Sequence, residues 1–116
     1  MGAAVLMTKA SMRSGAGLAT ALIPQCGYTV LQTAVPEAMV ETDKSQFHLS
    51  QIPKELLRYA AIGIGPGIGL HEETATVVVE LLKQVHQPTV LDADALNLLS
   101  IKQNLQELLH EDCILT

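Results

Sequence analysis

The amino-acid sequence predicts an α/β fold in which a mostly parallel sheet is flanked by helices. Short apolar segments alternate with helical patterns along the chain, which is typical of βαβ units. Hydrophobic residues make up 48% of the sequence and aromatic residues only 3%, so the core must be built from Ala, Val, Ile and Leu. Such a palette is typical of a parallel sheet buried on both faces. No linker or repeat interrupts the chain, and we expect residues 1–116 to form a single partial domain.

The first part of the chain is predicted to contain one helix and two strands. Residues 2–14 place many small side chains on a helix, and Gly15 suits the left-handed position that follows a helix C-terminus. Residues 18–23 read as an apolar strand that Pro24 stops. Residues 28–34 alternate Tyr, Val and Leu with Thr and Gln, which predicts a second strand.

Residues 41–54 are polar and irregular, and we expect them to form an excursion between sheet strands. We interpret Phe47 and His48 within this segment as packing and surface residues. After it the alternation of strand and helix resumes. The elements predicted there are a short helix near residues 54–59, a strand at 60–64, a helix at 72–84, a strand at 89–91, a helix that begins within 92–99, a short helix at 104–110 and a strand at 113–116.

Composition and charge exclude several classes of protein. The formal net charge is −5 and no basic stripe or aromatic platform is present, which argues against a nucleic-acid surface. No apolar run approaches the roughly 18 residues of a membrane span, and residues 1–15 lack the plan of a signal peptide. We therefore expect a cytoplasmic protein without a membrane partner.

The cysteines and histidines show no metal-binding or redox spacing. Cys26 and Cys113 lie far apart in sequence without a ligand-like neighbour, so we expect two buried free thiols rather than a zinc site or a CxxC motif. The four histidines form no HxxxH or HExxH pattern. The sequence therefore predicts no metal site.

A glycine-rich segment, Gly65-Pro66-Gly67-Ile68-Gly69, follows a predicted strand and opens a predicted helix. Gly65, Gly67 and Gly69 can adopt positive φ and let a ligand reach the backbone, so we interpret this glycine loop (residues 65–69) as the floor of a site. It matches neither a P-loop nor G-x-G-x-x-G, and Glu72 and Glu73 would repel phosphate there. The loop suits a flat or neutral part of a ligand; the alternative is a turn that serves only tight helix–strand packing.

A second polar cluster follows the strand at residues 89–91. Asp92 comes directly after the strand, where ligand contacts gather in α/β proteins, and Asp94 is placed to cap the next helix. Asn97 lies within reach of the same face. Both aspartates can instead be caps and turn formers, and a functional and a structural hydrogen bond are equally plausible for Asn97.

Five segments together resemble the ADP/ATP-dependent NAD(P)H-hydrate dehydratases, metabolite-repair enzymes of the ribokinase-like fold. They occur in the family's order and rough spacing over nearly the whole chain. The segments are Gly2-Ala3-Ala4, Arg13-Ser14-Gly15-Ala16-Gly17-Leu18, Pro36-Glu37-Ala38-Met39, the glycine loop, and Val90-Leu91-Asp92-Ala93-Asp94-Ala95-Leu96-Asn97.

The resemblance implies a lyase that restores NADH or NADPH from its hydrated form. In that chemistry ADP or ATP, with Mg²⁺, phosphorylates the hydroxyl added to the nicotinamide ring, and the ring nitrogen's electrons expel the phosphate. By this analogy Ala3, Ala4 and the glycine loop touch the hydrated dinucleotide. Asp92 and Asn97 line the same crevice.

The chain also departs from the family. The Pro-His-Pro-Gly-Glu stretch and the Gly-x-Gly-Asp turn, which carries the anion hole and the catalytic Asp, are absent from the sequence. We therefore expect an N-proximal fragment that lacks the C-terminal nucleotide-binding half, contains no catalytic residue and is inactive alone. An incomplete sheet leaves edges and apolar faces open, so we expect a homo-oligomer of tetramer type or a complementing chain.

Two other functions share these features. A ribokinase-like kinase that acts on a vitamin precursor or sugar would use the same sheet and glycine turn. A non-catalytic interaction module would use the apolar helices only to pair with a partner.

Overall fold

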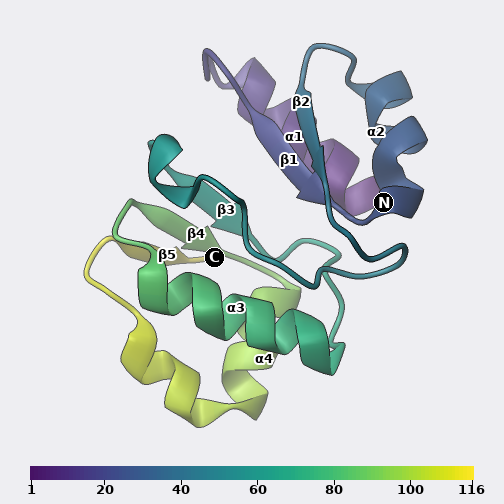
Figure 1. The fold of residues 1–116 in the computed structure, drawn as a ribbon. Helices are drawn as coiled ribbons and strands as arrows, with labels where there is room; N and C mark the ends of the chain where they lie inside the picture. The colour runs from purple at the N-terminus through teal and green to yellow at the C-terminus, as the bar shows by residue number, and fades with distance from the viewer.

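A computed structural model describes residues 1–116 and contains two parallel sheets (Figure 1). The first sheet has two strands, β1 (Thr20–Ile23) and β2 (Met39–Thr42). The second has three strands in the order β3 (Ile62–Ile64), β4 (Thr89–Leu91) and β5 (Cys113–Leu115). Every strand pair is parallel, which confirms the predicted α/β class with a parallel sheet flanked by helices.

The first sheet packs against α1 (Gly2–Arg13) and α2 (Tyr28–Ala34). The prediction of a strand at residues 28–34 is wrong, because this segment is α2 and the second strand lies at β2. Leu31 and Val35 are four residues apart and fully buried, which is the spacing of one helix face, whereas Val30 is exposed. The alternation of apolar and polar residues in this segment is therefore also compatible with the 3.6-residue period of a helix, which the structure adopts.

The second sheet is covered on one face by α3 (Glu72–Gln84), α4 (Asp94–Ile101) and the 3₁₀ helix η3 (Gln103–Leu108) (Figure 1). The predicted helix at 72–84 and the strand at 89–91 are confirmed, whereas the predicted strands at 18–23 and 60–64 are shorter than expected. The core of this part is aliphatic. Its buried members include Val78, Leu81, Leu82, Val85, Leu91, Leu98 and Leu105.

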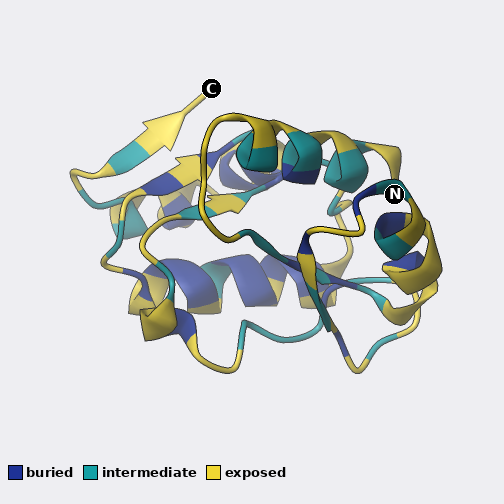
Figure 2. Cartoon of the chain, turned by 90° about the horizontal axis from the view of Figure 1, so that it is seen from above, coloured by how far each residue is buried: buried dark blue, intermediate teal, exposed yellow.

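The opposite face of the second sheet is largely uncovered, and α1 approaches it only at β3, where a Cβ on Gly63 would lie 3.9 Å from Met7 Sδ. Val90 and Ile114 are exposed there, and β5 is largely exposed along its length (Figure 2). The expectation of a sheet buried on both faces is therefore wrong for this chain. The helices bury one face only, and the aliphatic composition of the strands leaves the other face apolar and open to solvent.

No hydrogen-bonded ladder joins the two sheets, so β1 and β3 each keep one unpaired edge. A groove of about 1420 Å³ runs between them and is lined by residues of α1, β1 and β3. Met7 of α1, Ala21 of β1 and Ile62 of β3 contribute to its walls. The gap therefore lies between two strand edges, with α1 beside it.

The remaining predictions on the fold have mixed outcomes. Residues 41–54 are irregular beyond the end of β2, and a short 3₁₀ helix, η2 (Leu56–Arg58), stands where a short helix is predicted. Both cysteines are free, but Cys26 is exposed and Cys113 only partly buried, so the prediction of two buried thiols is wrong. No helix has the length and apolar character that crossing a membrane requires.

Candidate functional site

The glycine loop connects β3 to α3 and has the backbone conformation that the sequence predicts. The φ angles of Gly65, Gly67 and Gly69 are +137°, +73° and +75°, a region that side chains with a Cβ rarely adopt. The loop therefore needs glycine at these positions whether or not a ligand binds.

Gly65 is where the loop packs onto the end of β4. A Cβ on Gly65 would overlap the carbonyl oxygen of Asp92 and lie 3.1 Å from the Cβ of Ala95. The Asp92 N–H donates to the Ile64 carbonyl at 3.1 Å, which fixes the same junction from the other side. The carboxyl ends of β3 and β4 therefore meet, as expected for adjacent parallel strands.

Gly67 is where the loop meets the first helix. A Cβ on Gly67 would lie 3.2 Å from the Cβ of Ala3, at the start of α1. Because the methyl group of Ala3 is small, the helix end can approach the loop closely. The structure thus brings Ala3, the glycine loop and Asp92 together, as the sequence predicts.

Asp94 acts differently from the prediction. It does not cap α4, because the N-cap position is Ala93 and no side chain caps this helix. Instead, the Asp94 carboxylate accepts a hydrogen bond from the Gly69 N–H at 2.9 Å and another from the Asn97 side-chain amide at 3.2 Å. Asp94 therefore joins α4 to the far end of the glycine loop. The Gly69 N–H and one N–H of the Asn97 amide are engaged in these two hydrogen bonds.

The turn between β4 and α4 is conformationally strained. Ala93 has φ +49°, which makes it the chain's only residue other than glycine with positive φ. Its N–H donates to the Asp92 carboxylate at 2.7 Å. Strain of this kind is frequently found at functional turns, and the hydrogen bond from Ala93 holds the Asp92 carboxylate against this turn.

The predicted site residues do not all line one space. Ala4 and residues 65–68 line a cavity of about 320 Å³ that extends to His48. Ala3 and Asp92 instead line the neighbouring groove between β1 and β3. Gly69 and Asn97 line neither the cavity nor the groove. Both donate hydrogen bonds to the Asp94 carboxylate instead.

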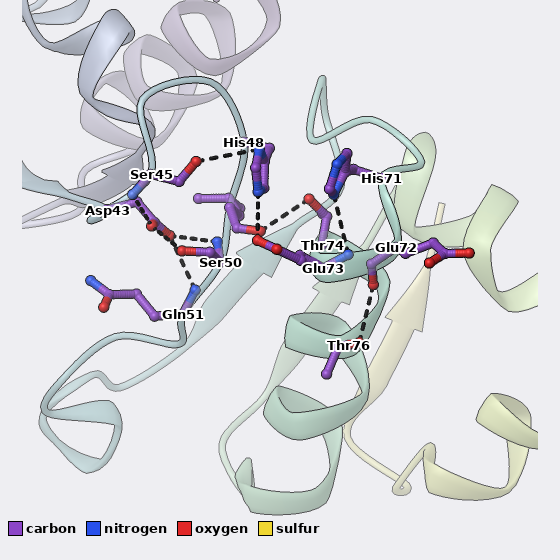
Figure 3. Close-up of polar contacts among 11 residues, drawn as sticks. Asp43, Ser45, His48, Ser50, Gln51, His71, Glu72, Glu73, Thr74 and Thr76 are labelled. Carbon is purple, nitrogen blue, oxygen red and sulfur yellow. Dashed lines mark hydrogen bonds and ion pairs between the residues drawn. The ribbon is translucent and has the colours of Figure 1, made fainter.

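The segment of residues 43–51 (the 43–51 loop) forms another part of the wall of the 320 Å³ cavity, and Asp43 organises this loop. The buried Asp43 carboxylate accepts four hydrogen bonds, from the Ser45 N–H at 2.8 Å, the Ser50 N–H at 2.7 Å, the Ser50 hydroxyl at 2.6 Å and the Gln51 N–H at 3.1 Å (Figure 3). Burial acts to raise the pKa of Asp43, but these hydrogen bonds outweigh it and hold the pKa below its usual value.

The 43–51 loop carries Phe47 and His48, which the sequence led us to interpret as packing and surface residues. Phe47 is 74% exposed, so its interpretation as a packing residue is wrong. It lines the 320 Å³ cavity together with His48. No local motif marked either residue, because the loop reaches the cavity only through the long-range contacts of the fold.

Comparison with known proteins gives a consistent result. The model of the family described as NAD(P)H-hydrate dehydratase matches residues 1–116. The bifunctional NAD(P)H-hydrate repair enzyme of Moorella thermoacetica is 36% identical over 85% of this chain and 20% of its own length. The ADP-dependent (S)-NAD(P)H-hydrate dehydratase of Lactococcus lactis is 36% identical over 84% of this chain and 34% of its own length.

A solved structure agrees with the sequence relatives. A ribokinase-like superfamily protein from Enterococcus faecalis superimposes with a TM-score of 0.74 and 29% identity, over 88% of this chain and 36% of that chain. The fold is therefore ribokinase-like, as predicted. The chain spans about a fifth to a third of the length of the two curated relatives named above.

The Asp43 hydrogen bonds predict a pH-dependent stability. Because the pKa of Asp43 is lowered on folding, its stabilising effect should be complete above the unfolded pKa of about 3.9 and be lost as pH falls through the folded value. At neutral pH, Asp43→Asn should lower the free energy of unfolding by about 1–3 kcal/mol. Urea unfolding at neutral pH and near pH 3 measures both effects.

Asp112→Asn is the matched control, because Asp112 is exposed and its carboxylate makes no hydrogen bond. It should change the free energy of unfolding by less than about 0.5 kcal/mol. If Asp43→Asn cost the same at both pH values, the assigned role of the Asp43 carboxylate would be wrong.

Proposed function

The chain belongs to the NAD(P)H-hydrate dehydratase family, and from this premise we propose that the whole protein is a metabolite-repair lyase that dehydrates hydrated NADH or NADPH. ADP is the favoured phosphate source, because the Lactococcus lactis relative is named an ADP-dependent (S)-NAD(P)H-hydrate dehydratase. The use of ATP as the phosphate source, the use of Mg²⁺ as a cofactor and a cytoplasmic location stay predictions from the sequence.

One observation carries the proposal for the site. The glycine backbone of Gly65 and Gly67, the neighbouring Pro66 and Ile68, and the small side chain of Ala4 help to line a cavity of about 320 Å³, which is within the size range of small-molecule pockets. We assign the hydrated nicotinamide ring to this surface. Gly65 and Gly67 contact the ring in this proposal, and Ala3 and Asp92, which line the neighbouring groove, contact the part of the substrate that extends into that groove.

The proposed roles differ among the residues. Gly65 and Gly67 let the ring approach the main chain, and the Asp92 carboxylate accepts a hydrogen bond from a polar group of the ligand. Gly69 and Asn97 act indirectly, because the carboxylate of Asp94 already accepts from their donors. They hold the loop against α4 in this proposal rather than contact the ligand.

The residues of this chain do not fit a nucleoside diphosphate with Mg²⁺ beside the glycine loop. Glu72 and Glu73 occupy the first turn of α3, where they oppose a phosphate group. Neither Lys nor Arg lines the 320 Å³ cavity. We therefore assign to this chain the binding of the hydrated ring, and we derive no phosphoryl-transfer step from its residues.

A small-molecule kinase is the alternative from the same fold. The match to the dehydratase family over residues 1–116 favours the lyase. An assay of the whole protein with hydrated NADH, and in parallel with a hydroxymethylpyrimidine or a sugar, separates the two functions. Turnover of only the second kind of substrate would favour the kinase.

We also propose that the open edges of β1 and β3 are closed in the working protein by another apolar strand. Both edges are unpaired, and the groove between them is lined by apolar side chains such as Met7 and Ile62. On the other side of the gap, Val77 and Leu81 of α3 line the neighbouring cavity. A strand inserted there would lie between α1 and α3 and would form one continuous sheet. A homo-oligomer is the second way to cover these surfaces.

Two alanine substitutions test the glycine loop in the whole protein. Gly67→Ala and Gly69→Ala place a Cβ at similar positive φ, so each should cost about 1–2 kcal/mol of stability. Only Gly67→Ala also pushes against Ala3, since the Cβ at Gly69 meets nothing within 4 Å. Because this contact displaces the surface to which the ring is assigned, Gly67→Ala should raise KM for hydrated NADH about tenfold, a change of ~1.4 kcal/mol in binding. Gly69→Ala should leave it nearly unchanged, and equal effects of both would contradict the assignment of the ring to this surface.

Amide hydrogen exchange tests the strand that closes the sheet. Amides at the facing edges of β1 and β3 should exchange quickly in the 116-residue chain and slowly in the whole protein, because pairing protects them. The amides of β4 are the control, since β4 is paired on both sides and should be protected in both proteins. Identical exchange of the β1 and β3 amides in the two proteins would contradict the proposal.

A further inference from the structure

Three potential metal ligands meet beside the start of α3. His48 comes from the 43–51 loop, and His71 and Glu73 come from the N-terminal end of the helix (Figure 3). One ligand atom from each residue lies within 4.8 Å of the other two. His48 and His71 are 23 positions apart in sequence (71 − 48 = 23), so only the fold brings them together.

The contacts within this cluster are close. His48 Nε2 lies 2.7 Å from the Glu73 carboxylate. The rings of His48 and His71 stack with centroids 4.1 Å apart and an interplanar angle of 21°. The Glu73 N–H donates to His71 Nδ1 at 3.2 Å, which makes His71 the N-cap of α3.

The surroundings hold the two parts of the cluster in place. The Thr74 hydroxyl is buried and donates to the Leu49 carbonyl at 3.1 Å, next to His48 in the loop. His48 Nδ1 lies 3.3 Å from the Ser45 hydroxyl, which can donate or accept. Because of this partner, the His48 ring can carry its proton on Nδ1 and leave Nε2 free as a ligand.

We propose that His48, His71 and Glu73 form a Zn²⁺ site that joins the 43–51 loop to α3. Two imidazoles and one carboxylate are a donor set that suits Zn²⁺ better than Mg²⁺, which prefers oxygen ligands. Tetrahedral bonds of about 2.0–2.1 Å place ligand atoms roughly 3.4 Å apart. The two rings must leave their stacked arrangement to bind, because a metal ion lies in the plane of each imidazole that coordinates it, and side-chain rotations then bring the three ligand atoms to that separation.

Binding exchanges existing hydrogen bonds for metal bonds. The His48–Glu73 hydrogen bond opens to admit the ion. His71 also loses the hydrogen bond that its Nδ1 accepts from the Glu73 N–H, either because Nδ1 itself binds the ion or because the ring proton moves to Nδ1 so that Nε2 can bind it. The positive end of the helix dipole opposes a cation there, whereas the carboxylates of Glu72 and Glu73 favour it. A fourth position stays open for water or a ligand, near the 320 Å³ cavity that His48 also lines.

Calorimetric titration of the 116-residue chain with Zn²⁺ alone tests the site through matched variants. His71→Asn removes the imidazole but keeps a residue that caps helices well, and His48→Gln keeps a side chain that can donate to Glu73. His86→Gln is the control, because His86 is exposed and stands outside the cluster. The wild type and His86→Gln should bind one Zn²⁺ with equal affinity. His48→Gln and His71→Asn should bind it at least about tenfold more weakly.

Equal Zn²⁺ affinity in all four proteins would overturn the proposal, because it would place the ion elsewhere, for example at the free thiols of Cys26 and Cys113. The absence of binding to the wild type would also overturn it. Co²⁺ spectroscopy of the wild type does not depend on the folding of any variant. Visible ligand-field bands without thiolate charge transfer would support the site, and thiolate charge-transfer bands would overturn it. Neither outcome depends on the proposed dehydratase activity.

Discussion

The packing of one bare residue, Gly65, against the carbonyl of Asp92 is the contact on which the geometry of this protein depends. No residue with a Cβ can occupy this position, because the side chain would overlap the end of β4. The contact joins the β3–α3 turn to the β4–α4 turn, and Asp94 adds a second link through the Gly69 N–H. With both turns joined, the start of α1 can rest on Gly67 and close one side of the cavity.

Much of the fold follows from local patterns where those patterns are strong. The apolar face of α3 has the helical period over a long run, and β4 is a short apolar run between turn residues, so both are predicted with their observed bounds. The segment at residues 28–34 fails because seven residues are too few to separate the two periods. The buried pair Leu31 and Val35, which identifies α2, extends beyond the predicted strand.

The candidate site is only partly predictable for a related reason. Gly65 and Asp92 follow adjacent strands, and the rule that such strand ends meet is enough to place them together. The contact between Asp94 and Gly69 and the cluster of His48 with Glu73 each join residues 25 positions apart. No short spacing signals such contacts, because they depend on how the loops cross in the folded chain. Membership of the dehydratase family supports the proposed chemistry, and the packing indicates where this chain would contribute to it.

A crystal structure of the whole protein with hydrated NADH bound, in the absence of nucleotide, would show where the hydrated ring binds. We expect the hydrated ring to lie in van der Waals contact with the backbone of residues 65–68, with the Asp92 carboxylate within hydrogen-bond distance of the ligand. A structure in which a packed side chain covers that backbone, and Asp92 faces bulk water while the ring binds elsewhere, would contradict it.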